Sequence, residues 1–142
     1  MRTLIIVKPD GVRRGLMGEC IKRFERAGFK LCGLKILKAD MKKAERLYAV
    51  HKGKPFYNDL MKYITSRPVA VIILESALDA ENAIKLVRKI VGATNPLNAE
   101  MGSIRGDYGS IISENIVHAS DSKESADYEI PIFFDQSELV NY

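Results

Sequence analysis

Residues 69–74 of this 142-residue chain read VAVIIL, and residues 3–7 read TLIIV. Short runs that are apolar or β-branched at every position are typical of strands in the interior of a sheet. Turn-forming residues, Pro9 to Gly11, follow the first run, so we expect that strand to end near Val7. The two runs therefore predict a first strand and a central strand, both buried.

The sequence between these strands alternates between helix and strand patterns. Apolar residues recur at helical spacing over residues 16–27, and Gly28 is suited to end that helix. Residues 29–38 alternate as a second strand, in which Gly33 predicts a bulge. A helical hairpin follows, because Asp40 is a candidate N-cap and Pro55 a candidate first residue of a second helix.

Three further elements are expected after residue 74: a helix over 79–91, a short strand over 115–119 and a helix over 122–129. The whole order predicts an α/β fold of the βαββαβ type. In it, a four-stranded antiparallel sheet carries helices packed on one face, plus the inserted hairpin. Residues 92–114 show no sustained period, and a loop that long inside a compact domain is more often functional than idle. No repeat or linker interrupts the chain, so we expect one domain over residues 1–142.

Composition narrows the class of protein. Hydrophobic residues make up 46% and charged residues 28%, which is ordinary for a globular domain. No apolar run approaches the ~20 residues that span a bilayer, and the first residues lack a signal-peptide pattern, so a cytoplasmic protein without a membrane partner is expected. Cys20 and Cys32 fit no metal or redox spacing and are interpreted as small buried thiols.

The charge is unevenly distributed along the chain. Residues 1–67 hold 17 Lys and Arg against 6 Asp and Glu, whereas residues 68–142 hold 5 against 12. Two interpretations stay open: an anionic partner for the first half, or complementary packing of the two halves within the chain or between subunits.

Phosphate-binding glycine motifs are absent, since neither GxxxxGK[ST] nor GxGxxG occurs. A phosphate site would have to be built from side chains instead. Candidates are the cations Lys8, Arg88 and Arg105, each near the end of a predicted element, with Thr94 from the long loop.

His118 is the strongest candidate for catalysis. It lies at the end of a predicted strand among the polar residues of NIVHASDS, and Glu129 near the end of the next helix could fold back to accept its second ring N–H. A carboxylate on one ring nitrogen leaves the other unprotonated, as a nucleophilic imidazole requires. A structural histidine is the alternative. Asp121 and Ser122 are also candidate helix caps, because Asp121 and Glu124 fit a capping box.

Aromatic residues of the hairpin have two interpretations. At helical spacing, Tyr48, Phe56 and Tyr57 would be core residues, and we expect at least one of them to be so. An exposed Phe56 beside a basic segment would instead stack on a nucleobase, a contact that tolerates every base. These residues together predict phosphoryl transfer that involves nucleotides.

Several motifs resemble those of the nucleoside diphosphate kinase family. They are TLIIVKPDGVRRGLMGE, HKGKPFY, GATNP, GSIRGDYG and NIVHASDS, and they occur in the family's order from Thr3 to about Val140. The resemblance implies a ferredoxin-like fold. It also implies transfer of the γ-phosphate from a nucleoside triphosphate such as ATP to a nucleoside diphosphate, by a ping-pong route through a phosphohistidine, with broad base and sugar tolerance.

The resemblance also implies roles for individual residues. His118 matches the nucleophile, Glu129 the carboxylate that orients it, and Ser120 the hydroxyl that supports Glu129. The remaining matches are Lys8 (sugar hydroxyl and transferred phosphate), Tyr48 (near the histidine and γ-phosphate), Arg88, Thr94 and Arg105 (phosphates), His51 (β-phosphate), Asn115 (ribose), Phe56, Leu60 and Ile112 (base slot), and Asp121 (Mg²⁺, through water).

Departures from the family pattern concern assembly rather than chemistry. Residues 75–82, ESALDAEN, are about four residues longer than the usual turn; Arg67 replaces a glycine, Met101 a proline and Ser103 a threonine. The resemblance implies a hexamer, with a tetramer as the alternative. A nucleic-acid-binding module of similar topology is the rival function, but the aromatic strand motif of such modules is absent, so nucleic acid is not expected as a partner. A non-catalytic relative would be expected to lack His118, Lys8 or Arg105.

Overall fold

The computed structural model describes residues 1–142 and contains one four-stranded sheet in the order β2-β3-β1-β4. The strands are β1 (Arg2–Val7), β2 (Lys30–Leu37), β3 (Val69–Glu75) and β4 (Val117–Ala119). All three pairings are antiparallel, and β1 pairs with β3 from Arg2↔Glu75 to Val7↔Ala70. The two apolar runs thus form the central strands, and the predicted antiparallel βαββαβ sheet is confirmed.

Seven α-helices surround the sheet: α1 (Pro9–Arg13), α2 (Met17–Arg26), α3 (Met41–Leu47), α4 (Tyr57–Ser66), α5 (Ala80–Val91), α6 (Ile104–Tyr108) and α7 (Lys123–Phe133). Short 3-10 turns cover Ala49–His51, Pro96–Asn98 and Gln136–Glu138. None of these helices is long and apolar enough to cross a lipid bilayer.

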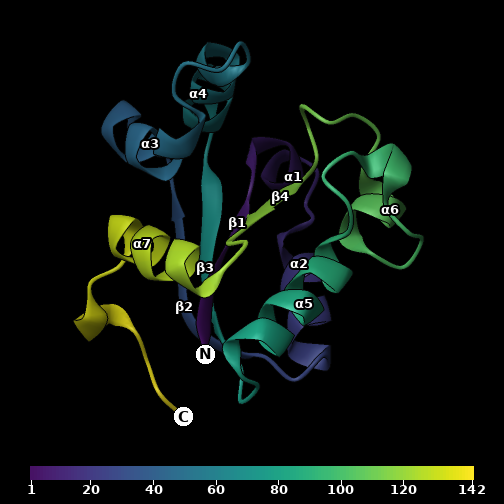
Figure 1. Cartoon of the computed structure of the whole chain (residues 1–142), viewed down its shortest axis with the longest axis vertical. Coiled ribbons are helices and arrows are strands. Elements are labelled where there is room, and N and C mark those ends of the chain that lie inside the picture. Colours follow the sequence, from purple (N-terminus) through teal and green to yellow (C-terminus); the bar gives the residue numbers. More distant parts are fainter.

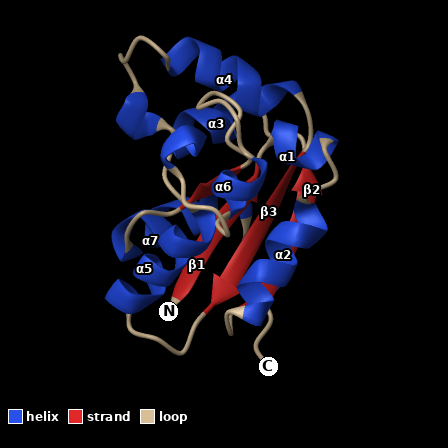
Figure 2. Cartoon of the chain, turned by 90° about the vertical axis from the view of Figure 1, so that its right-hand side faces the viewer, coloured by secondary structure: helices blue, strands red, loops and turns tan.

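Helices cover both faces of the sheet, which corrects the expectation of one covered face. Leu4 and Ile6 of β1 pack with residues of α3, α4 and α7, whereas Ile5 and Val7 pack with residues of α2 and α5. Figure 1 shows the two layers on opposite sides of the strands, and Figure 2 shows the same elements from the side. A strand that is apolar at every position has two apolar faces, and each must be removed from water.

Other expectations of local structure change at the ends of the elements. Pro9 to Gly11 are not a turn but the first residues of α1, and the loop over 92–114 contains α6. The last strand begins at Val117 instead of residue 115, and α7 continues past residue 129 to Phe133. The predicted bulge in β2 is confirmed between Leu31 and Gly33. There the glycine leaves room for the ring of Phe134, which would lie 2.9 Å from an added Cβ.

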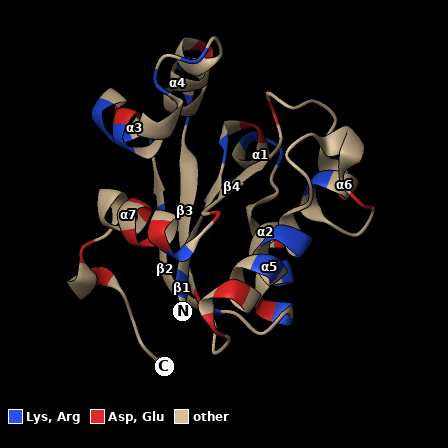
Figure 3. Ribbon diagram, in the orientation of Figure 1, with Lys and Arg blue, Asp and Glu red and all other residues tan.

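Charge complementarity within the chain accounts for part of the uneven charge distribution. Four long-range ion pairs each join a cation of residues 1–67 to an acid of residues 68–142: Arg2–Glu75, Arg13–Glu114, Arg23–Asp107 and Lys35–Glu138. Figure 3 shows basic residues on α3 and acidic residues on α7. Lys8, Arg88 and Arg105 form no ion pair within the chain, so their positive charge remains available to a ligand.

Candidate active site

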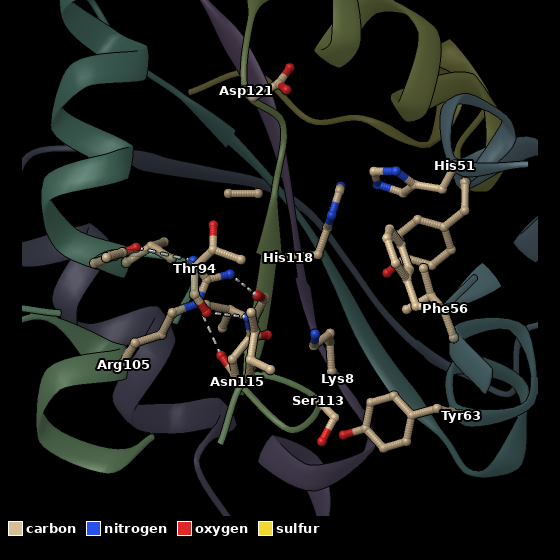
Figure 4. Close-up of a pocket in the computed structure, with 18 of the residues that line it drawn as sticks. Lys8, His51, Phe56, Tyr63, Thr94, Arg105, Ser113, Asn115, His118 and Asp121 are labelled. Atoms are coloured by element: carbon tan, nitrogen blue, oxygen red, sulfur yellow. Dashed lines mark hydrogen bonds between the residues drawn. The ribbon is translucent and has the colours of Figure 1, made fainter. Parts of the chain in front are cut away.

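A cavity of about 740 Å³ opens where β1 and β4 meet the hairpin and the 92–115 segment. It brings together all but one of the predicted site residues: Lys8, Tyr48, His51, Phe56, Leu60, Arg88, Thr94, Arg105, Ile112, Asn115, His118, Ser120 and Asp121. In Figure 4, Thr94, Arg105 and Asn115 lie on one side of His118 and Lys8, with His51 and Phe56 on the other. The exception, Glu129, does not line the cavity but contacts the ring of His118 directly.

His118 is held through one ring nitrogen. It pairs with Ile6 in the sheet, and its Nε2 lies 3.1 Å from Oε2 of Glu129, which is almost fully buried. Ser120 Oγ donates to the same oxygen at 2.5 Å. A carboxylate only accepts hydrogen bonds, so Nε2 carries the proton and Nδ1 of the neutral ring keeps its lone pair. The Tyr48 ring packs nearly perpendicular to the imidazole, with 5.8 Å between ring centroids and 87° between the ring planes.

Arg105 is anchored by the backbone around the cavity. Its guanidinium donates to the carbonyls of Asn115 (3.1 Å), Gly92 (3.0 Å) and Val117 (2.6 Å). A guanidinium has five N–H groups, so two remain for a ligand. Burial, together with the nearby charge of Arg88, lowers the pKa of Arg105 to about 10, which leaves it charged at neutral pH.

Lys8 brings a second buried cation to the cavity. It follows the last residue of β1 and is 7% exposed. Burial, and after it the charge of Arg105, lower the pKa of Lys8 to about 8, although the charge of Asp10 offsets part of this shift. A buried ammonium with a lowered pKa favours an anionic ligand, because a nearby phosphate would add negative charge that stabilises the protonated form.

Asn115 presents an unpartnered acceptor. Its Nδ2 donates to the carbonyl of Thr94 at 2.8 Å, while the buried Oδ1 has no hydrogen-bond partner. Buried polar atoms in native proteins are nearly always hydrogen-bonded, so a vacant acceptor in a cavity wall indicates a ligand donor such as a hydroxyl.

The hairpin supplies an aromatic wall. Phe56 is 49% exposed, whereas Tyr48 is buried in the core and Tyr57 packs partly buried against it. The core interpretation is confirmed for Tyr48, and stacking of a base on Phe56 stays a prediction. The ring of His51 lies 5.4 Å from that of Phe56, and its Nδ1 is 3.2 Å from Nζ of Lys54. Partial burial, then the charges of Lys54 and His118, lower the pKa of His51.

Asp121 lines the cavity but does not cap the helix that follows. Ser122 is the N-cap of α7, and its hydroxyl accepts from the Ser125 backbone N–H at 3.0 Å. Asp121 instead accepts from Ser125 Oγ at 2.6 Å. The predicted capping box is therefore wrong, because the hydroxyl one position later takes the cap, which leaves the Asp121 carboxylate at the cavity.

Comparison with known proteins places this geometry in a family. The family model for nucleoside diphosphate kinase matches residues 1–139. A nucleoside diphosphate kinase from Thermomicrobium roseum is 52% identical over 141 residues, which cover 99% of this chain and 92% of that protein. One from Sulfurisphaera tokodaii is 51% identical over 139 residues, or 98% and 92% of the two chains. The chain belongs to the nucleoside diphosphate kinase family.

Solved structures of family members have the same fold. A nucleoside diphosphate kinase family protein from Babesia bovis superposes with a TM-score of 0.93 at 45% identity, covering 99% of this chain and 93% of that one. A halophilic member from Halobacterium salinarum, solved in complex with CDP, gives a TM-score of 0.93 at 42% identity, with coverage of 100% and 92%. These likenesses confirm the ferredoxin-like fold.

Family membership establishes the class of reaction. This member is a phosphotransferase that binds nucleotides and moves phosphate between them, as the nucleoside diphosphate kinase family does. Phosphotransferases of this kind use a divalent metal with the nucleotide phosphates. The rival interpretation as a nucleic-acid-binding module is not favoured.

Sequence reasoning missed three residues beside the site. Asp10 is buried, Tyr63 lines the cavity, and Ile116 is the only non-glycine residue with positive φ, at 74°. The sequence does carry a signal for Asp10, because proline followed by an acidic residue is typical of a helix start as well as of a turn. Nothing in the sequence marks Ile116, since a β-branched residue is among the least suited to positive φ.

Proposed function

We propose that His118 carries the phosphoryl group between nucleotides. Its Nδ1 attacks the γ-phosphorus of a nucleoside triphosphate, the bond from that phosphorus to the β,γ-bridging oxygen breaks, and the diphosphate leaves. In the second half-reaction a β-phosphate oxygen of an acceptor diphosphate attacks, the P–N bond breaks, and Nδ1 recovers its lone pair. The hydrogen bond from His118 Nε2 to Glu129 carries this proposal. It keeps the proton on Nε2, so Nδ1 can attack without a separate base.

Cations around the transferring group would stabilise the reaction. A phosphoryl transition state is loose and asks mainly for positioning and positive charge. Lys8, Arg88 and the two unused N–H groups of Arg105 are suited to the phosphates, with Thr94 on the side of Arg105 and His51 on the opposite side of the cavity. Because most of this charge is buried, it acts in a medium of low polarity and interacts strongly with phosphate.

The nucleoside is proposed to bind by stacking and by one hydroxyl contact. Phe56 with Leu60 and Ile112 would hold the base between apolar surfaces, and such stacking does not distinguish bases. The vacant Oδ1 of Asn115 would accept from a ribose hydroxyl. This division explains how one cavity serves donors and acceptors with different bases.

Mg²⁺ is the divalent ion we propose. No group of three metal-ligating side chains occurs in the chain, and the carboxylates that line the cavity are Asp121, three residues after His118, and Asp59. That donor set fits Mg²⁺, which keeps several waters and binds through one or two carboxylates plus substrate phosphates. The ion would neutralise phosphate charge, with Asp121 holding it through water.

The chain is proposed to act as one domain over residues 1–142 in a hexamer in the cytoplasm, with a tetramer as the alternative. Apolar side chains that face solvent support assembly: Leu97 and Met101 are 81% and 82% exposed, and Leu34 and Ile36 are exposed on edge strand β2. Both cysteines are free, as is usual in a reducing compartment. Sedimentation velocity distinguishes six copies from four.

Labelling tests the phosphohistidine. Purified protein with γ-labelled ATP, Mg²⁺ and no acceptor should gain acid-labile, base-stable label, and a GDP chase should move that label to GTP. We expect His118→Ala to abolish labelling and to lower kcat/KM by at least about 10³-fold, since nucleophile removal in other enzymes has effects of this order or larger. His51→Ala is the matched control, as the only other histidine, and should still be labelled. Substantial transfer by His118→Ala would remove the histidine mechanism.

A further inference from the structure

The chain makes a strained turn directly before β4. The Val117 N–H donates to the Asn115 carbonyl at 2.8 Å, and Ile116 between them has φ of 74°. This is the γ-turn with positive φ, which is rare and strained, and here its central residue is β-branched. Such a conformation persists only where the surrounding structure holds it, and such strain is concentrated at functional sites.

Asp10 holds this turn. Its side chain is 1% exposed, and its Oδ2 accepts from the Ile116 N–H at 3.0 Å. Its Oδ1 accepts from the hydroxyl of Tyr63, and that hydroxyl accepts in return from the Asp10 N–H at 3.0 Å. The carbonyl of Ile116 accepts from the Lys8 N–H at 2.7 Å, so both backbone groups of the strained residue are bonded to the segment around Asp10.

The residues on either side of the turn lead to the cavity. The carbonyls of Asn115 and Val117 both accept from Arg105, and the Asn115 side chain carries the vacant Oδ1. Glycine is required at position 11 for close packing here, because an added Cβ would lie 3.0 Å from the Ile116 carbonyl oxygen and 2.7 Å from Val7 Cγ1. A small rotation of the turn would therefore redirect the Asn115 amide.

The geometry points to Asp10 as a positioning residue that, by holding the Ile116 turn, aims the Asn115 side chain at the bound nucleotide. This inference rests on the proposed function, in which Asn115 accepts from the ribose. Asp10 itself touches no reacting atom. It joins α1, the hairpin through Tyr63, and the start of β4, which are the segments that carry Lys8, Phe56 and His118.

A double-mutant cycle tests the inference. Asp10→Asn keeps the shape of the side chain but places an amide N–H₂ against either the Ile116 N–H or the Tyr63 hydroxyl. We expect it to lower kcat/KM for ATP by about 30-fold in the wild type and by less than about 3-fold in an Asn115→Ala background, since residues acting through one another are non-additive. Tyr63→Phe removes one hydrogen-bond donor to the same carboxylate. It should lower kcat/KM by about 5-fold in the wild type and by less in the Asn115→Ala background.

Controls separate positioning from folding and from the proposed function. Asp127→Asn makes the same charge change at an exposed residue of α7 that does not line the cavity, and it should stay within about 2-fold of wild type. Circular dichroism melts establish that each variant is folded; if Asp10→Asn is not, the Tyr63→Phe cycle decides. Equal losses in both backgrounds, or a folded Asp10→Asn within 2-fold of wild type, would overturn the inference. Absence of label on wild-type His118 would instead overturn the proposed function.

Discussion

The apolar part of β1 and the segment that follows the strand have opposite chemistry. From Leu4 to Val7 the strand is fully buried among apolar side chains on both faces, and β3 beside it is apolar from Val69 to Leu74. Immediately after Val7, buried polar groups begin. Around the cavity they are Lys8, Asp10, Arg105, Asn115, Ser120 and Glu129.

The difference shows where stability and chemistry are located. Burial of apolar surface stabilises the sheet at about 25 cal/mol per Å². At the cavity the fold instead keeps a lysine with a lowered pKa, an amide oxygen without a partner, and a strained Ile116 that costs about 1–3 kcal/mol. Such groups destabilise the free protein and favour a charged ligand. Substitutions in the sheet should therefore lower stability and leave activity nearly unchanged, whereas substitutions at the cavity should lower activity without lowering stability.

The largest effect on stability is expected in the sheet. Leu74 is fully buried at the end of β3 away from the cavity and pairs with Thr3. Leu74→Ala should lower the free energy of unfolding by about 2–5 kcal/mol, because it removes apolar contact and leaves a void. Urea unfolding at fixed protein concentration measures this loss, and kcat/KM at 20 °C should stay within about 3-fold. Val50→Ala, at a 79% exposed position, is the control and should change stability by less than about 0.5 kcal/mol.

Lys8 should show the reverse signature. Its pKa is about 8 in the folded chain against 10.5 in the unfolded chain, so the folded state disfavours the proton, and stability rises as pH goes from 8 to 10.5. Lys8→Met should therefore stabilise the protein at pH 7 by up to about 3 kcal/mol, while lowering kcat/KM by about 10²-fold. Unfolding at several pH values gives the check: the advantage of Met should shrink above pH 8. A variant less stable than wild type at pH 7 would contradict this account of the cavity.

Phe56 should affect binding alone. Its ring is half exposed, so Phe56→Ala should change the free energy of unfolding little. The loss of stacking, worth about 1–3 kcal/mol per base, should raise KM by about 10-fold for each nucleotide, with kcat nearly unchanged. Steady-state kinetics with ATP, GTP, CTP and UTP make the measurement. A loss limited to purines or to pyrimidines would contradict base-independent stacking.

Local patterns were sufficient for most elements, and they failed where several signals compete. The helix over 79–91 follows its apolar period closely, and the strands at 3–7 and 69–74 follow their continuous apolar runs. Pro9 and Asp10 are common both in turns and at helix starts, and the structure takes the helix. The 92–114 segment has glycines that interrupt its period, yet Ser103 caps α6 by accepting from the Gly106 N–H at 3.0 Å. Such caps span three residues and give little periodic signal.

The sequence by itself determined the order of the elements, the central strands and the residue types available for chemistry, because apolar periodicity and motifs are local properties. It also indicated His118 with Glu129, eleven residues apart. The tertiary structure alone decided that helices cover both faces of the sheet, and that Arg105 donates hydrogen bonds to the backbone carbonyls on either side of Ile116. It also decided that Asp10 meets that turn across 106 residues of chain. Contacts of such separation depend on how whole elements pack, and no local pattern encodes them.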